Sequence, residues 1–157
     1  SRGLGDVYKR QRLMWMDAVY EPGEVKVVAY NKDGKAVAEK TVRTAGKPHH
    51  IELVSNRNEL TADGKDLAYV TVKVVDKDGN LCPTDSRLIH FSVKGAGKFR
   101  AVANGDPTNL EQFHLPKMHA FHGMLTAIVQ AGEIAGDLVL TAKASGVKTG
   151  TVHLQAK

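Results

Sequence analysis

The stretch ELTADGKDLAYVTVKVVDKDGN, residues 59–80, decides the fold class of this 157-residue chain. Apolar residues alternate with polar or aromatic ones through its middle, at Ala68, Val70, Val72 and Val74. A period of two is typical of a half-buried β-strand. The run ends at Asp78-Gly79, a turn in which we expect Gly to adopt a positive φ and Asp to hydrogen-bond to nearby backbone. The stretch therefore predicts a strand held between two turns.

The same alternation recurs in six more segments, and turn signals separate them. The apolar positions are Ile51 and Leu53; Ile89, Phe91 and Val93; Phe99 and Ala101; Leu125, Ala127 and Val129; Leu138, Leu140 and Ala142; Val152 and Leu154. Seven strands with turns every 8–12 residues or so indicate an all-β sandwich. Residues 109–121 resemble a helix most closely, but Pro116 has no backbone donor. We expect a long loop there, with room for one short helical turn.

A second block precedes the sandwich and also has the pattern of β-structure. Residues 25–29 predict a strand, Asp33-Gly34 a turn, and residues 37–42 the return strand, with one more strand before them. Three short strands bury little core by themselves. The block is therefore either docked on the following sandwich or the tail of a larger domain. Gly46-Lys47-Pro48 is the predicted linker, because proline stiffens the chain and ends the preceding strand.

These patterns divide the chain into three parts. Residues 1–11, SRGLGDVYKRQ, match neither block, and we expect an extraneous or disordered start. Residues 12–48 form the partial β domain of about three strands, and residues 49–157 form the sandwich.

Composition narrows the classes of protein. Charged residues make up 25% of the chain and apolar residues 42%, which is typical of a globular protein. The net charge is +5, but the lysines are scattered, so we expect no nucleic-acid partner. No run approaches the roughly 20 apolar residues that span a bilayer, and no signal peptide is recognised. The single cysteine, Cys82, is expected to be a buried, inert thiol.

No motif predicts catalysis or a cofactor, and we expect no catalytic, cofactor-binding or metal site. The calcium-loop pattern starting at Asp76 fails, since its twelfth position is the cation Arg87. His114, His119 and His122 share one loop at irregular spacing, which favours polar loop residues over a zinc site. The glutamates are scattered along the sequence, and neither a nucleophile elbow nor a phosphate-binding loop is present.

Four residues are candidates for contact with carbohydrate or with a neighbouring domain. Trp15 and Tyr20 would suit a sugar platform and would equally suit a domain contact. Asn104 and Asp106 lie in NGDPT, residues 104–108, where Asn-Gly and Asp-Pro both favour turns. This segment is either a tight corner or a loop that reaches toward another domain. We expect Phe91, Phe99 and Phe121 to belong to the core.

Several segments together resemble the C-terminal accessory region of bacterial glycoside hydrolase family 2 enzymes, many of them β-galactosidases. The upstream block, RLMWMDAVYEPGEVKVVAYNKDGKAVAEKTVRTAGKP, is similar to the end of an accessory domain in that family. LTADGKDLAYVTVKVVDKDGN, VANGDPT, AFHGMLTAIVQ and GDLVLTAKASGV resemble the immunoglobulin-like domain that follows it. The resemblance covers nearly everything from residue 12 onward. Cys82 is not a feature expected from the family.

The resemblance implies a non-catalytic immunoglobulin-like β-sandwich that packs on the catalytic part or extends its substrate cleft. In this family catalysis belongs to an upstream barrel with two glutamates, and no residue here matches those motifs. The implied partners are the catalytic and other domains of the same parent chain, with carbohydrate as a further candidate, and the implied location of the parent is secreted or periplasmic. Two alternatives stay open: a stand-alone carbohydrate-binding module, and a stalk module of a bacterial surface adhesin.

Overall fold

The computed structural model describes residues 19–157, and these fall into two compact units. The first unit is Ser1–Arg43, of which residues 19–43 are described, and the second is Thr44–Lys157. All regular elements in the described residues are β-strands, in agreement with the predicted all-β class. Among these residues there is no helix of the length and apolar character needed to cross a membrane.

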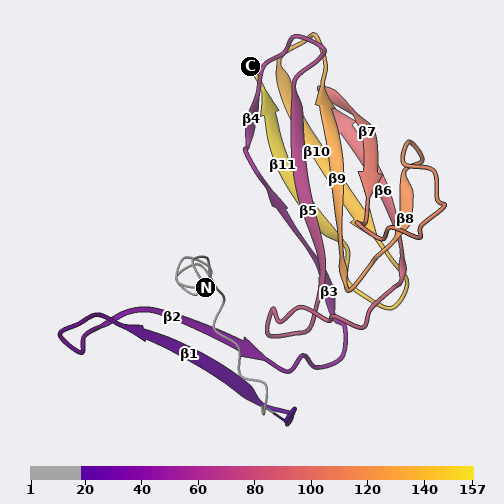
Figure 1. The fold of residues 1–157 in the computed structure, drawn as a ribbon. Coiled ribbons are helices and arrows are strands. Elements are labelled where there is room, and N and C mark those ends of the chain that lie inside the picture. The colour runs from indigo at the N-terminus through magenta and orange to yellow at the C-terminus, as the bar shows by residue number, and fades with distance from the viewer. Residues whose placement is uncertain (1–18) are drawn as a thin grey trace, which may run out of the picture. The chain divides into compact units, whose positions relative to one another are not determined.

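The second unit is a sandwich of two sheets stacked face to face (Figure 1). One sheet has the order β4-β11-β10-β6-β8, formed by Glu59–Leu60, Gly150–Ala156, Gly136–Lys143, Leu88–Gly95 and Lys117–His119. The other has the order β3-β5-β9-β7, formed by His50–Ser55, Leu67–Val75, Met124–Ala131 and Gly97–Ala103. Neighbouring strands pair antiparallel except β4, which runs parallel to β11.

Alternation along each strand separates the inner and outer faces of the sheets. On β5, Val70, Val72 and Val74 have no exposed surface, whereas Tyr69 is 46% exposed. Val70 lies opposite Ala127 of β9, so apolar residues meet across the ladder as well as between the sheets. Each fully buried aliphatic side chain contributes about 1.5–3 kcal/mol to folding.

The core contains buried side chains from both sheets. Phe91 of β6 stacks on Phe99 of β7, with ring centroids 5.8 Å apart, so this pair joins the two layers. The largest fully buried aliphatic residues include Ile89, Leu138 and Leu140. Cys82 is free and buried, as predicted, and burial raises the pKa of its thiol. The carboxylates of Asp76 and Asp85 raise it further. The thiol is therefore suited to packing rather than to nucleophilic chemistry.

All seven predicted sandwich strands are present, and two short strands were missed. The missed strands are β4 and β8, which have two and three residues. Segments this short cannot display a period of two, and both are identified only by the strand they pair with. The predicted loop at residues 109–121 contains no helical turn. It ends instead in β8, which pairs antiparallel with β6.

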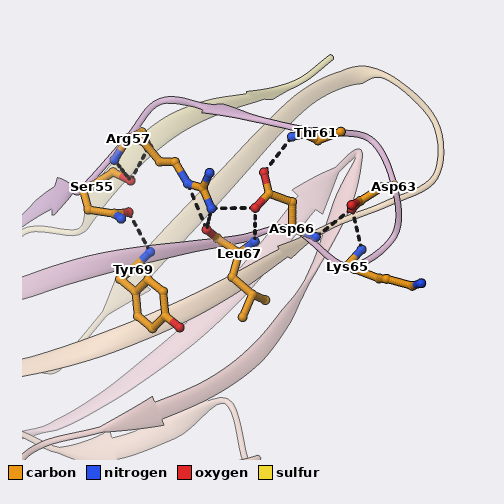
Figure 2. A network of polar contacts seen from close by, with 9 residues as sticks. Ser55, Arg57, Thr61, Asp63, Lys65, Asp66, Leu67 and Tyr69 are labelled. Atoms are coloured by element: carbon orange, nitrogen blue, oxygen red, sulfur yellow. Dashed lines mark hydrogen bonds and ion pairs between the residues drawn. The ribbon is translucent and has the colours of Figure 1, made fainter.

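The segment before β5 is held by a network of polar contacts (Figure 2). The carboxylate of Asp66 accepts hydrogen bonds from the backbone of Thr61 and Leu67 and pairs with Arg57. The Asp63 carboxylate accepts the backbone N–H groups of Lys65 and Asp66, each at 2.8 Å. Both aspartates satisfy backbone donors of their own turn, which is a structural role. The stretch that opens the sandwich is therefore part of its frame.

The turn after β5 differs in one respect from the prediction. Gly79 has the expected positive φ of 83°, but the carboxylate that bonds to the backbone belongs to Asp76, not to Asp78. Asp76 is 3% exposed and accepts the N–H groups of Asp78, Asn80 and Gly46. The bond from Gly46, 2.8 Å long, tethers the segment before β3 to this turn. Sequence could not predict it, because its partners are 30 residues apart.

The described part of the first unit is a β-hairpin, formed by β1 (Glu24–Tyr30) and β2 (Ala36–Arg43). Val25 lies opposite Val42, and both are more than 60% exposed. The charged residues of the adjoining positions form two cross-strand ion pairs, Glu24 with Arg43 and Lys26 with Glu39. The hairpin was predicted, whereas the expected strand before it lies outside the described residues, as does the start at residues 1–11.

Candidate functional site

The loop from β7 to β8 is shaped by the NGDPT segment. Asn104 accepts the backbone N–H of Asp106 at 3.1 Å and donates Nδ2 to the carbonyl of His119 at 3.0 Å. Asp106 Oδ1 accepts the backbone N–H and the hydroxyl of Thr108, at 2.8 and 2.7 Å. The segment is thus a pair of side-chain-stabilised turns that fasten the start of the loop to the end of β8.

This loop forms one wall of an open groove with a volume of about 720 Å³. The groove is lined by residues that are far apart in the sequence, among them Ser86, Asp106, Asn109, Glu111, His119 and Phe121. In Figure 1 the loop lies beside β8, at the end of the sheet order β4-β11-β10-β6-β8.

Ser86, which also lines the groove, lies between two residues that form a well-packed ion pair. Asp85, whose side chain is 6% exposed, binds Arg87 through Nε and Nη2 at 2.6–2.9 Å. Arg87 also donates Nη1 to the carbonyl of Ser145 at 2.7 Å. Burial by itself would raise the pKa of Asp85, but the hydrogen bonds from Arg87 outweigh it and the pKa is lowered. Ser86, between the two, is therefore presented to the groove by a fixed backbone.

Two carboxylates give the groove its charge. Glu111 accepts the backbone N–H of His119 at 3.1 Å and pairs with its ring Nδ1 at 3.0 Å. Partial burial would raise the pKa of Glu111, but these contacts outweigh it and the pKa lies below its ordinary value. The pKa of Asp106 is also lowered, chiefly by the backbone N–H and the hydroxyl of Thr108. Both groups are therefore ionised at neutral pH.

The apolar part of the groove comes from Phe121 and Leu110. Phe121 is half-buried and lies outside the core cluster, so the prediction that it belongs to the core was wrong. The centroid of its ring lies 4.2 Å from that of the His122 ring, and His122 is exposed. His122 has a φ of 50°, the one positive φ outside glycine among residues 19–157. The following Gly123 could not carry a side chain, since a Cβ would lie 2.3 Å from the Cys82 carbonyl oxygen.

Two of the four predicted contact residues, Asn104 and Asp106, lie together in this groove. Tyr20 is 75% exposed in the first unit, and Trp15 lies outside the described residues. Sequence reasoning missed Ser86, Glu111, His119 and Phe121. Glu111 and His119 are eight residues apart on either side of Pro116, so only the strand pairing of β8 shows that the loop folds back. Ser86 carries no signal in the sequence.

The described residues contain no group of three or more His, Cys, Asp or Glu side chains placed to hold a metal ion. The fold and the groove together define an immunoglobulin-like β-sandwich module with a polar loop groove at its edge.

Comparison with known families identifies the kind of module. The profile of Glycoside hydrolase family 2 C-terminal domain 5 matches residues 51–153, and the chain belongs to this family. A domain of unknown function, DUF4982, matches residues 2–38, a range that includes most of residues 1–11, which were expected to be an extraneous or disordered start.

Individual relatives agree with this assignment. The chain is 44% identical over 138 residues to Beta-galactosidase BoGH2A of Bacteroides ovatus, which covers 88% of this chain and 16% of that protein. Among solved structures it resembles a glycosyl hydrolase family 2 member from Bacteroides cellulosilyticus, with a TM-score of 0.81 and 31% identity over 89% of this chain and 18% of the other. A beta-glycosidase from Bacteroides vulgatus gives a TM-score of 0.83 and 27% identity over 87% and 18%. The chain therefore spans less than a fifth of the length of these relatives.

Proposed function

We propose that this chain is the non-catalytic C-terminal β-sandwich region of a β-galactosidase-like family 2 glycoside hydrolase, and that it packs on the catalytic part or extends its cleft. The observation that carries the proposal is the family match over residues 51–153 combined with 16% coverage of the Bacteroides ovatus β-galactosidase. A stiff two-layer frame with contacts confined to loops suits a supporting domain.

The partners in this proposal are the catalytic and other domains of the same parent protein, and the parent is secreted or periplasmic. The 44% identity to a β-galactosidase supports a galactoside as the substrate of the parent. The residues that would face a partner are those of loops rather than of the core, because strand ladders and core positions are already satisfied within the sandwich.

Two assays test this function. The purified 157-residue chain should not cleave a chromogenic β-galactoside, because catalysis is assigned to another part of the parent. The parent enzyme lacking residues 49–157 should keep measurable cleavage of a small aryl galactoside while unfolding at a lower temperature. Turnover by the isolated chain that scales with its concentration would contradict the proposal, and so would an unchanged melting temperature after the deletion.

A further inference from the structure

We propose that the groove between the NGDPT loop and Ser86 is a binding subsite for a neutral sugar ring. The subsite would contact the substrate away from the bond that is cleaved. The choice of a galactoside as its ligand rests on the proposed function, whereas the choice of a neutral sugar rests on the groove itself.

Hydrogen-bonding groups that face the groove remain available in the described part of the chain. Asp106 uses Oδ1 to hold Thr108, which leaves Oδ2 to accept from a ligand hydroxyl. The hydroxyl of Ser86 has no intramolecular partner among these residues, and His119 uses Nδ1 for Glu111, which leaves Nε2. A charged acceptor beside neutral donors suits sugar hydroxyls, each of which can both donate and accept.

Asn109 lines the groove, but its side chain is used within the loop itself. Its Oδ1 accepts the backbone N–H of Glu111 at 2.9 Å, and its side chain helps to hold the pKa of the Glu111 carboxyl below its ordinary value. Asn109 therefore shapes the wall of the groove and offers no donor to a ligand.

The apolar side of a sugar ring has a matching surface. Phe121 is half-buried in the groove, and Leu110 is 96% exposed at its edge. Small-molecule sites combine apolar walls with a few convergent polar groups, and this groove has both. An aromatic ring fixed by its neighbours contributes contact area at little entropic cost.

Charge sets the class of sugar. Asp106 and Glu111 both line the groove; Glu111 pairs with the ring of His119, whereas the Asp106 carboxylate is hydrogen-bonded only to Thr108 among the described residues, with the ring of His122 near enough to lower its pKa. The carboxylate of a uronic acid placed here would lie close to Asp106, and like charges repel strongly when partly shielded from water. The groove therefore favours a neutral hexose over a uronic acid.

The test is an NMR titration of the ¹⁵N-labelled 157-residue chain with methyl β-galactopyranoside and with the methyl glycoside of galacturonic acid. The two ligands differ only at C6. The neutral ligand should shift the amides of residues 86, 104–111 and 119–121, with a Kd of about 1–10 mM for so shallow a site. The uronate should bind at least about fivefold more weakly.

Variants make the test specific. Asp106→Asn keeps the oxygen that accepts from Thr108 but removes the charge. It should therefore weaken binding of the neutral sugar about tenfold. It should also reduce the difference in affinity between the neutral sugar and the uronate. Ser86→Ala should weaken binding about threefold to tenfold. The matched controls Asp78→Asn and Ser92→Ala, both at exposed positions away from the groove, should bind as the parent chain does.

Each outcome bears on one part of the proposal. Shifts with methyl β-glucopyranoside but not with the galactoside would keep the subsite and overturn the galactoside assignment of the proposed function. Shifts outside the groove, no shifts with any neutral sugar, or equal affinity of Asp106→Asn and the parent chain would overturn the subsite.

Discussion

The hairpin β1–β2 and the sandwich strand β5 follow the same alternating pattern in sequence but end in different environments. In the sandwich the apolar positions of β5 lie between two sheets, and Val72 has no exposed surface. In the hairpin the equivalent residue Val25 is 66% exposed. A period of two thus predicts which residues share a face, whereas burial depends on a second layer. The pattern alone cannot reveal that layer.

Removing a valine from each region tests this difference most strongly. Val72→Ala should lower the free energy of unfolding by about 2–3 kcal/mol, because two buried carbon groups are lost and a cavity remains. Val25→Ala should change it by less than about 0.5 kcal/mol, because its surface is already in contact with water. Urea denaturation of both variants measures the two values. Equal losses would show that the hairpin valine is as buried as the core valine.

A smaller effect is expected from the tether between the linker segment and the turn after β5. The N–H of Gly46, then the side chain and backbone of Asn80, hold the pKa of Asp76 well below its ordinary value. Ionised Asp76 therefore stabilises the fold at neutral pH, and this stabilisation is lost as the pH falls below about 4. Asp76→Asn keeps one side-chain oxygen as an acceptor, so it should lower the urea midpoint at pH 7 less than Val72→Ala does.

The pH dependence of unfolding tests whether the charge of Asp76 is responsible for this stabilisation. The difference in unfolding free energy between the parent chain and Asp76→Asn should shrink steadily from pH 5 toward pH 2, because the parent chain alone loses an ionised Asp76. Asp33→Asn, an exposed substitution in the hairpin turn, should give a difference that does not change with pH in this way. A difference that grew toward low pH would contradict the assigned role of the carboxylate.

The smallest effect is expected from the charged face of the hairpin. Lys26 and Glu39 pair at 2.8 Å, but their side chains are 46% and 64% exposed. Exposed pairs of this kind contribute about 0.2–1 kcal/mol and are weakened by salt. A double-mutant cycle with Lys26→Ala and Glu39→Ala measures the coupling free energy of the pair. The readout is the change of the NMR signals of the hairpin amides with temperature. We expect a coupling near the lower end of that range. A coupling that persists in about 1 M salt would show that the pair is shielded from solvent.

The strands of at least six residues could be predicted because each shows its own local period. β4 and β8 could not, since two or three residues carry no period and depend on β11 and β6 for their identity. Asn104 and Asp106 were recognisable from their turn chemistry, which is local. Ser86 and Phe121 reach the same groove through tertiary packing, and nothing near them in the sequence indicates it.

The difference between the two regions is most directly measured by amide hydrogen exchange at residue resolution in the 157-residue chain. Amides of the central strands β5, β9, β6 and β10 should exchange only through global unfolding, because their ladders lie over a closed core. Amides of β1 and β2 should exchange orders of magnitude faster through local opening, because the valines of that hairpin are exposed. Protection of β1 and β2 equal to that of β5 and β9 would contradict the distinction between a sandwich that closes its own core and a hairpin that does not.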